Sequence, residues 1–227
     1  MSRGALIVFE GCDRVGKSTQ VRLLLDKLRK HGYKAETFAF PDRSTDLGKF
    51  IDQYLKANVD MEPREAHLVF SANRQAAVEK MRKKLFDGCH IVVDRYAYSG
   101  IAYTIAKKTM DLGLEWAQLQ DVGILKPDCV IFFDLTPEMA SSRSGFGAER
   151  LEALELQKRV YTVMKKLGEQ NKDIWKDVDA SLPPETVSEN VWKIVEPFIQ
   201  KASNSPLALI DIEPSRCTVT QAKELFN

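Results

Sequence analysis

The residues best suited to chemistry stand near the start of the chain, in the stretch FEGCDRVGKST at 9–19. Gly11, Gly16, Lys17 and Ser18 match the pattern G-x-x-x-x-G-K-[ST]. Glycines at these places let the backbone curl so that successive N–H groups point at phosphate oxygens, and a following helix adds the positive end of its dipole. Lys17 can then reach the β- and γ-phosphates of a nucleoside triphosphate, while Ser18 can ligate Mg²⁺.

A second group of candidates lies in VVDRYAYSG at 92–100. Asp94 would end a buried strand, at the edge where a parallel sheet opens its ligand crevice. A carboxylate there can hold a water bound to Mg²⁺, and Arg95 beside it can bind the phosphate of an acceptor. Three more arginines fall in or near loops: Arg14, Arg43 and Arg74. Each alone is typical of a solvated surface, but together they suit the charge on a phosphoryl group in transfer.

Alternating elements must position these residues. Short apolar runs predict buried strands at 5–9, 35–40, 90–94, 129–135 and 174–180. Amphipathic or charged segments between them predict helices over 17–31, 46–57, 64–87, from about 97, and over 148–170 and 185–202. This alternation predicts an α/β fold, a parallel sheet with helices on both faces.

Composition limits the remaining possibilities. The 227 residues fit one domain, and 44% hydrophobic with 29% charged residues is ordinary for a soluble globular protein. A net charge of +1 gives no basic surface for nucleic acid, so we expect no nucleic-acid partner. No run approaches the roughly 18 apolar residues of a membrane span, and the first apolar run is too short for a signal peptide. No membrane partner is therefore expected.

Neither the cysteines nor the histidines have the spacing of a metal site. The cysteines stand at 12, 89, 129 and 217 and the histidines at 31, 67 and 90. We expect reduced thiols, as in a cytosolic protein. Cys12 alone could become reactive near a helix N-terminus, but a small filler in the loop is the favoured interpretation.

A missing motif and the size of the chain disfavour two classes of protein that bind nucleoside triphosphates. A switch GTPase would need a guanine-reading N-K-x-D, and the nearest string, NKDI at 171–174, ends in isoleucine. A nucleotide-driven motor would normally be larger. The chain therefore fits a kinase for a small acceptor.

At these residues the sequence resembles the thymidylate kinases. Six segments recur in the order and spacing of that family: RGALIVFEGCDRVGKSTQ, FPDRSTDLGKFIDQYL, HLVFSANRQ, VVDRYAYSGIAYTIAK, LKPDCVIFFDL and FGAERLE. The resemblance spans residues 3–202 and implies a five-stranded P-loop nucleoside monophosphate kinase fold. It also implies transfer of the ATP γ-phosphate to dTMP to give dTDP, for dTTP synthesis in DNA replication. Mg²⁺ would be the cofactor, ATP and dTMP the substrates, and the assembly a homodimer. We expect a cytoplasmic location, with nuclear or mitochondrial pools left open.

The resemblance further implies roles for single residues. Contacts to ATP would come from Gly11, Asp13, Arg14, Val15, Gly16, Lys17, Ser18, Thr19 and Arg143. Arg143 would lie on the adenine, and Ser18 and Asp94 would hold the metal, Asp94 through water. The catalytic set would be Arg14, Lys17, Asp94 and Arg95. Arg14 would bridge the two phosphates, as in eukaryotic-type members with an arginine in this loop.

On the acceptor side the same resemblance implies contacts to dTMP from Asp13, Phe40, Arg43, Phe70, Arg74, Arg95, Gly100 and Tyr103. Arg43 and Arg95 would bind the phosphate. Asp13 would bind the 3′-hydroxyl, and Tyr103 would crowd the 2′ position. Phe70 would stack on thymine, and Arg74 would donate to its O4. No general base is expected, since the acceptor phosphate oxygen is already ionised.

We expect a single domain over 1–209 with a lid at about 141–152, and an extension at 210–227 to which we assign no role. Gln75 stands where the family often has tryptophan, and Leu151 where it often has tyrosine.

Two other functions remain open. One is another P-loop nucleoside or nucleotide kinase; a nucleoside acceptor would need a base for its hydroxyl, whereas Arg43 and Arg95 favour a nucleotide. The other is a nucleotide-binding regulatory or scaffold protein that has lost catalysis. The intact residues Arg14, Lys17, Ser18 and Asp94 disfavour it.

Overall fold

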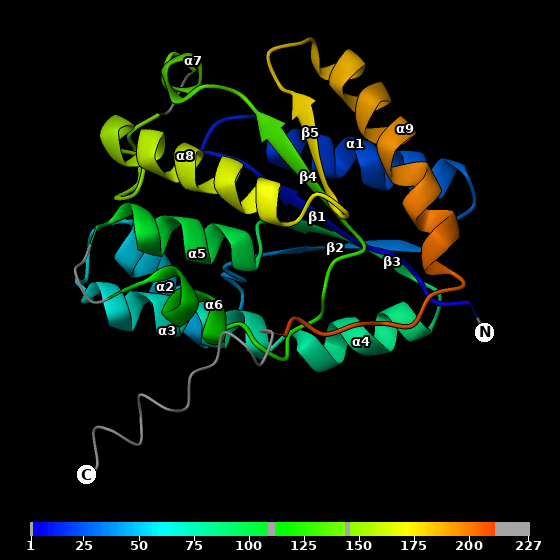
Figure 1. Cartoon of the computed structure of the whole chain (residues 1–227), viewed down its shortest axis with the longest axis horizontal. Helices are drawn as coiled ribbons and strands as arrows, with labels where there is room; N and C mark the ends of the chain where they lie inside the picture. The colour runs from blue at the N-terminus through cyan, green and yellow to red at the C-terminus, as the bar shows by residue number, and fades with distance from the viewer. Residues whose placement is uncertain (1, 109–111, 144–145, 212–227) are drawn as a thin grey trace.

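The computed structural model describes residues 2–108, 112–143 and 146–211 (Figure 1). Its strands are β1 Leu6–Glu10, β2 Ala35–Ala39, β3 His90–Asp94, β4 Cys129–Asp134 and β5 Trp175–Asp179. They form one sheet in the order β2-β3-β1-β4-β5, and every pairing is parallel. The predicted five-stranded parallel sheet is confirmed, with each strand within one residue of its expected bounds at either end.

Helices cover both faces of this sheet, as predicted. Helices α1 (Lys17–Lys30) and α9 (Pro184–Ala202) pack together on one face. The other face is covered by α4 (Val78–Phe86), α5 (Ala97–Ala106) and α8 (Leu154–Gln170). Helices α2 (Asp46–Leu55), α3 (Pro63–Gln75) and α6 (Leu114–Leu119) lie beyond α5, and short α7 (Pro137–Ser141) precedes α8 (Figure 1). Among described residues no helix is long and apolar enough to cross a membrane.

The carboxyl ends of the central strands set the place of the site. All five residues of β1 are fully buried, because its neighbours β3 and β4 flank it and helices cover both faces. The loop 11–16 follows β1, and Asp94 ends β3 directly beside Phe9 of β1. The phosphate loop and the segment that begins at Asp94 and Arg95 therefore meet at one edge of the sheet.

The expected helix over 64–87 is wrong as a single helix. Helix α3 ends at Gln75 and α4 begins at Val78, with Ala77 at φ −90° and ψ −12° between them. No glycine or proline marks this break in the sequence. The cause is tertiary, because α3 packs on α5 whereas α4 packs on β3.

The predicted helix over 148–170 begins only at Leu154. The residues before Leu154 form turns, and one of their backbone groups bonds outside the segment: Arg150 N–H donates to Leu55 O at 2.9 Å. Helices α6 and α7 were not predicted.

The expected extension at 210–227 is described only in part, since residues 212–227, including Cys217, lie outside the described residues. Ile210 does not hang free: its N–H donates to Ile124 O at 2.7 Å, and its carbonyl accepts from Gly123 N–H at 2.9 Å. Where the structure describes them, the cysteines 12, 89 and 129 are free and buried.

Candidate active site

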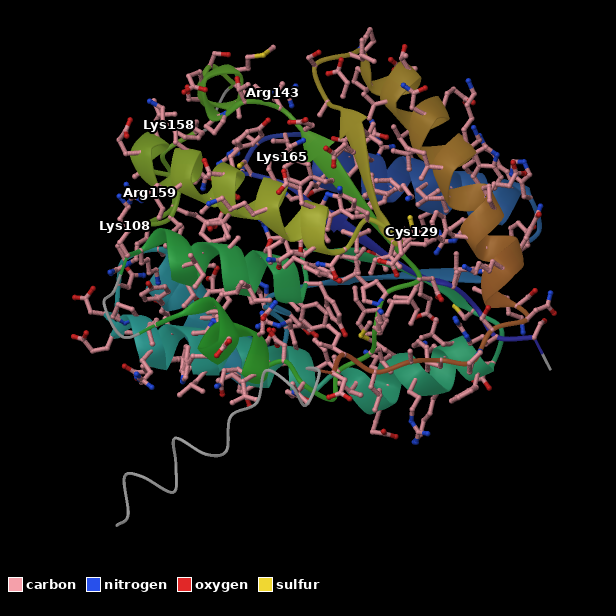
Figure 2. All side chains as sticks on the ribbon, in the orientation of Figure 1. Lys108, Cys129, Arg143, Lys158, Arg159 and Lys165 are labelled. Atoms are coloured by element: carbon pink, nitrogen blue, oxygen red, sulfur yellow. The ribbon has the colours of Figure 1, made fainter. Side chains whose placement is uncertain are left out.

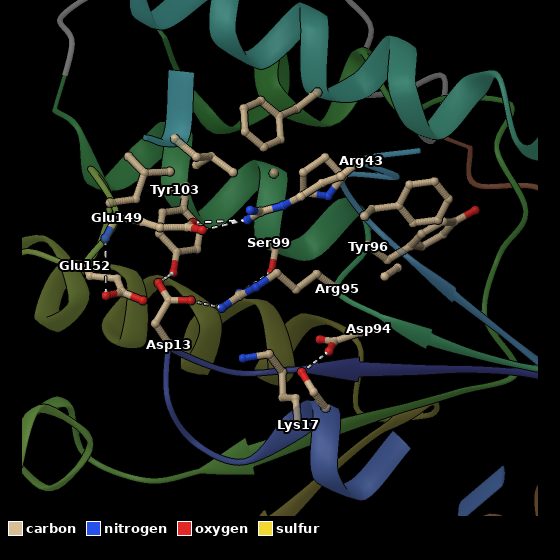
Figure 3. Close-up of a pocket in the computed structure, with 18 of the residues that line it drawn as sticks. Asp13, Lys17, Arg43, Asp94, Arg95, Tyr96, Ser99, Tyr103, Glu149 and Glu152 are labelled. Carbon is tan, nitrogen blue, oxygen red and sulfur yellow. Dashed lines mark hydrogen bonds and ion pairs between the residues drawn. The ribbon is translucent and has the colours of Figure 1, made fainter. Parts of the chain in front are cut away.

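A cavity of about 700 Å³ opens at the carboxyl edge of the sheet (Figure 3). The structure brings together there nearly all the residues predicted for the site: Asp13, Arg14, Gly16, Lys17, Ser18, Thr19, Phe40, Arg43, Phe70, Arg74, Asp94, Arg95, Gly100, Tyr103 and Arg143. Gly11 and Val15 do not line it. Val15 is 2% exposed and packs in the core, so only its backbone is available for a ligand.

The phosphate loop has the conformation that its glycines permit. Gly11 and Gly16 have φ of 145° and 97°, and a Cβ on Gly11 would lie 3.0 Å from Phe133 O. Lys17 Nζ donates to the loop carbonyls of Gly11 at 3.1 Å and Cys12 at 2.6 Å. Burial, with the nearby charge of Arg95, lowers the pKa of Lys17 to about 8.

Cys12 is the filler that the sequence favoured, not a reactive thiol. It is 1% exposed, and burial raises the pKa of its thiol to about 12. The thiol therefore stays protonated at neutral pH.

Ser18 and Asp94 meet at the base of the cavity. Ser18 Oγ donates to Asp94 Oδ2 at 2.7 Å (Figure 3). No group of three or more His, Cys, Asp or Glu side chains among the described residues could cage a metal ion. One hydroxyl and one carboxylate suit a hard cation that takes its remaining ligands from water and phosphates.

Arg95 lies at the centre of the acceptor end of the cavity. It has φ of 64°, a left-handed conformation that is uncommon for a side chain of this size. Its Nη1 donates to Gly11 O and to Ser99 Oγ, each at 3.0 Å, and its Nη2 pairs with Asp13 (Figure 3). The guanidinium is thus fixed between the phosphate loop and α5.

Asp13 is the shared partner of several groups. Its Oδ2 accepts from Tyr103 OH and from Gln157 Nε2, both at 2.7 Å. Burial opposes the charged form, but the charges of Arg95 and Lys17 and these bonds hold the pKa of Asp13 below its ordinary value. Asp13 is therefore an ionised acceptor at neutral pH.

Two residues that were not predicted from the sequence support the network around Asp13 and Arg95. Gln157 is fully buried on α8, and its Oε1 accepts from Asp13 N–H at 3.0 Å. Glu10 is fully buried and accepts from the N–H groups of Tyr96 and Ser99 at 2.9 and 3.0 Å. Burial raises the pKa of Glu10, although these bonds and Arg95 oppose the rise. A polar residue inside an apolar pattern was the available signal in both cases.

Two carboxylates from the expected lid face the arginines. Glu152 Oε1 lies 3.1 Å from Arg14 Nε. Glu149 Oε1 lies 2.8 Å from Arg43 Nη2, as Figure 3 shows. Arg43 also pairs with Asp52 at 2.6 Å. The cationic side of the cavity is therefore compensated by carboxylates, two of them from the segment just before α8.

Arg143 approaches the phosphate loop from the other side. Its Nη1 donates to Arg14 O at 2.9 Å and its Nη2 to Ala180 O at 3.1 Å. Figure 2 shows it beside α7, well apart from Cys129 in the sheet. Both bonds go to neutral carbonyls, so they do not cancel the charge of Arg143.

Apolar residues, among them Phe40, Leu55 and Phe70, also line the cavity. Phe70 is half-buried on α3, with its ring edge-on to Tyr54 at 6.4 Å between centroids. Arg74, one turn further, is 2% exposed and pairs with Asp121. A Cβ on Gly100 would lie 2.7 Å from Arg74 Nη2, so the position needs glycine. The 5%-exposed Phe40 packs on Tyr96 at 5.7 Å.

Comparison with known proteins identifies this arrangement. A thymidylate kinase family model matches residues 9–191. The chain belongs to the thymidylate kinase family. It is 44% identical to a human thymidylate kinase over 205 residues, which cover 90% of this chain and 96% of the relative. It is 43% identical to the thymidylate kinase of Caenorhabditis elegans over 203 residues, 86% of this chain and 91% of the other.

A solved structure agrees with these sequences. The thymidylate kinase of Candida albicans superposes with a TM-score of 0.83 at 34% identity, over 93% of this chain and all of that one. That enzyme is described as having a broad substrate specificity and a novel structural element. Membership of the family makes this chain an ATP-dependent kinase that phosphorylates dTMP to dTDP.

The two departures from the family pattern have different surroundings. Gln75 is exposed, and its Nε2 donates to Val122 O at 3.1 Å, away from the cavity lining. Leu151 lines the cavity and packs against the small apolar cluster around Ile51 and Tyr54. Of these two residues, only Leu151 lines the cavity.

Proposed function

We propose that the cavity divides into a donor end at the phosphate loop and an acceptor end between Arg95 and Phe70, with phosphoryl transfer between them. One observation carries this proposal: Lys17, Arg14, Arg43 and Arg95 all line one cavity, while Phe70 lines its far end. Positive charge at the centre suits a transferring phosphoryl group, and an aromatic end suits a base.

At the donor end the backbone of 11–16 cradles the phosphates of ATP, and Lys17 exchanges its loop carbonyls for phosphate oxygens. Arg143 has no carboxylate partner among the described residues, and its position beside the loop supports contact with the adenine. Arg14 leaves Glu152 for the oxygens that gain charge in the transition state.

Ser18 and Asp94 would hold Mg²⁺, Asp94 through water. Their 2.7 Å contact places a hydroxyl and a carboxylate side by side at the loop, which fits a cation that arrives with the nucleotide. When bound, the ion neutralises charge on the phosphates.

At the acceptor end Arg95 and Arg43 bind the dTMP phosphate, and Asp13 and Tyr103 meet the sugar. Arg95 is fixed by Gly11 and Ser99, so it can hold the phosphate in line with the donor. Arg43 is released from Glu149 as the phosphate replaces that carboxylate. No side chain needs to act as a general base, because the attacking phosphate oxygen is already ionised.

At the base end Phe70 stacks on thymine beside Phe40 and Gly100. Arg74 carries only donors, so it favours the O4 acceptor of thymine and opposes the amino donor of cytosine. We also propose one domain over 1–209, a lid at about 141–152, a cytoplasmic location and a homodimer. Sedimentation of the 25.7 kDa chain would test the homodimer, and a monomeric mass would exclude it.

The function is tested by ADP release with dTMP, dUMP, dCMP and thymidine at saturating ATP. We expect dTMP to be best and dUMP poorer, since one methyl group is worth about 10–200-fold. A polar site can reject a ligand that lacks its partner by about 10⁴-fold, so dCMP is expected to be nearly inert. Thymidine should be inactive if the arginines serve a nucleotide. Equal rates with dCMP and dUMP would exclude base reading by Arg74.

A further inference from the structure

A buried ion pair closes the base end of the cavity. The side chains of Arg74 and Asp121 are 2% and 1% exposed. Arg74 Nε donates to Asp121 Oδ1 and Nη2 to Oδ2, both at 2.8 Å. Two parallel bonds between a planar guanidinium and a carboxylate fix the plane of the guanidinium as well as its position.

Asp121 is itself held from two sides. Ser71 Oγ of α3 donates to Asp121 Oδ1 at 3.0 Å. Directly after Asp121 the chain pairs with the segment that follows α9: Gly123 N–H donates to Ile210 O, and Lys126 N–H to Ala208 O, both at 2.9 Å. Figure 1 shows that segment running back past α4 to the loop after α6.

The pair has no net charge, which separates it from the phosphate-binding side of the cavity. A compensated arginine offers hydrogen-bond donors without attracting a phosphate, which suits a neutral base. Arg74 lines the cavity, whereas Asp121 is not among the lining residues. The bonds to Asp121 use Nε and Nη2, so Nη1 is not engaged by them.

We propose that Asp121 is a positioning residue for base recognition: it fixes Arg74 so that a donor faces the base and an oxygen acceptor is preferred there. Asp121 acts only through Arg74 and does not touch the substrate. This inference rests on the proposed base-reading role of Arg74. It is independent of the phosphates, which other residues bind.

The decisive measurement is the ratio of kcat/KM for dTMP to that for dCMP. In Asp121→Asn an amide NH₂ donor replaces one carboxylate oxygen, so Arg74 loses one of its two hydrogen bonds to residue 121. We expect the ratio to fall about tenfold or more, because a buried site then no longer presents its donor in one place. The dTMP KM should rise while kcat changes little. A general loss of folding would instead lower the active fraction for both substrates alike.

Arg74→Gln and the double variant complete the test. If Asp121 acts through Arg74, Asp121→Asn in the Arg74→Gln background should leave the ratio unchanged, a strongly non-additive cycle. An unchanged ratio in Arg74→Gln alone would exclude base reading by Arg74. A lowered ratio there, with a wild-type ratio in Asp121→Asn, would overturn the role of Asp121 and leave Arg74 in place.

Two further variants guard against misfolding. Asp128→Asn breaks the Arg3–Asp128 pair at 2.7 Å, which lies outside the cavity lining, and should lower the melting temperature without moving the ratio. Ser71→Ala removes the hydroxyl that donates to Asp121 Oδ1 at 3.0 Å and to Gln120 O at 2.7 Å and keeps the ion pair, so the proposal stays testable if Asp121→Asn does not fold. We expect its ratio to fall by about two- to threefold, in line with one hydrogen bond. An unchanged ratio in both Ser71→Ala and Asp121→Asn would overturn the proposal; if Asp121→Asn does not fold, an unchanged ratio in Arg74→Gln overturns it.

Discussion

Two arginines that line the same cavity, Arg74 and Arg43, are paired with carboxylates in opposite ways. Arg74 and Asp121 are both nearly inaccessible and share two bonds between buried elements. Arg43 and Glu149 are 44% and 30% exposed, and Glu149 comes from the segment before α8. A buried pair cannot separate without leaving a charge unpaired, whereas an exposed pair costs little to exchange. The Arg74 end is therefore a fixed floor, and the Arg43 end is an exchangeable rim.

This difference matches what each end must do. A base is neutral and is recognised by shape and by donors in fixed places. A phosphate is charged and must replace whatever anion the arginines hold beforehand. Arg14 shares with the rim that its partner Glu152 precedes α8, but it is intermediate in exposure, since Arg14 is 35% and Glu152 only 7% exposed. Changes at the rim should therefore act on turnover and charge, and changes at the floor on binding of the base.

The largest expected effect is at Arg14. If Arg14 moves from Glu152 to the transferring phosphoryl group, its contacts strengthen mainly in the transition state. Arg14→Ala should then lower kcat by about 10²-fold or more, with little change in the dTMP KM. Steady-state kinetics with varied dTMP decides this. An unchanged kcat would show that Arg14 does not stabilise the transition state.

A substitution at Phe70 tests whether the floor of the cavity binds the base. Stacking of a base on an aromatic ring is worth about 1–3 kcal/mol, so Phe70→Ala should raise the dTMP KM about tenfold or more. Its half-buried ring lines the cavity and is only partly packed, so the fold should survive. The melting temperature is the control. A collapsed melting temperature with normal residual kinetics would make Phe70 a core residue instead.

The fold could be predicted closely because strands buried on both faces leave an unambiguous record in the sequence. Continuous apolar runs placed the central strands β1, β3 and β4, whereas the edge strands β2 and β5 mix buried apolar with exposed polar residues. The phosphate loop located the edge of the sheet that carries the site. The break between α3 and α4 left no such record, since Ala76 and Ala77 are good helix formers. Helix α7 did leave one: Thr136 caps it, accepting from Met139 N–H, and Pro137 opens it.

The site could be predicted as a set of residues but not as a set of partners. Lys17, Asp94 and Arg95 stand in recognisable strings, so their types and spacing were enough to place them. Gln157 and Asp121 act through contacts with residues far away in the chain, which no local pattern displays. The pairing of Arg43 with Glu149 joins residues 106 positions apart, so only the folded chain reveals the rim.

Lys17 differs from the arginines of the cavity because its charge changes with pH, whereas the arginines stay protonated. Its pKa of about 8 lies below the ordinary value, so above pH 8 the free enzyme loses this proton. Phosphates favour the protonated form, and binding then requires proton uptake. We expect the ATP Kd to rise by up to about tenfold per pH unit above pH 8 and to be flat just below it. Calorimetry in buffers of different ionisation enthalpy measures the uptake, and a flat Kd between pH 8 and 9.5 would contradict it.

The smallest expected effect tests the exchange at the rim directly. Glu149 competes with the acceptor phosphate for Arg43, so Glu149→Gln should lower the dTMP KM. An exposed ion pair is worth about 0–1 kcal/mol, which limits the change to about two- to fivefold. Because charge is involved, the difference from wild type should shrink at high salt. Asp46→Asn breaks an exposed pair with Lys49 outside the cavity lining and should leave KM unchanged. A higher KM in Glu149→Gln would mean that Glu149 assists the substrate, and the rim would then not be exchangeable.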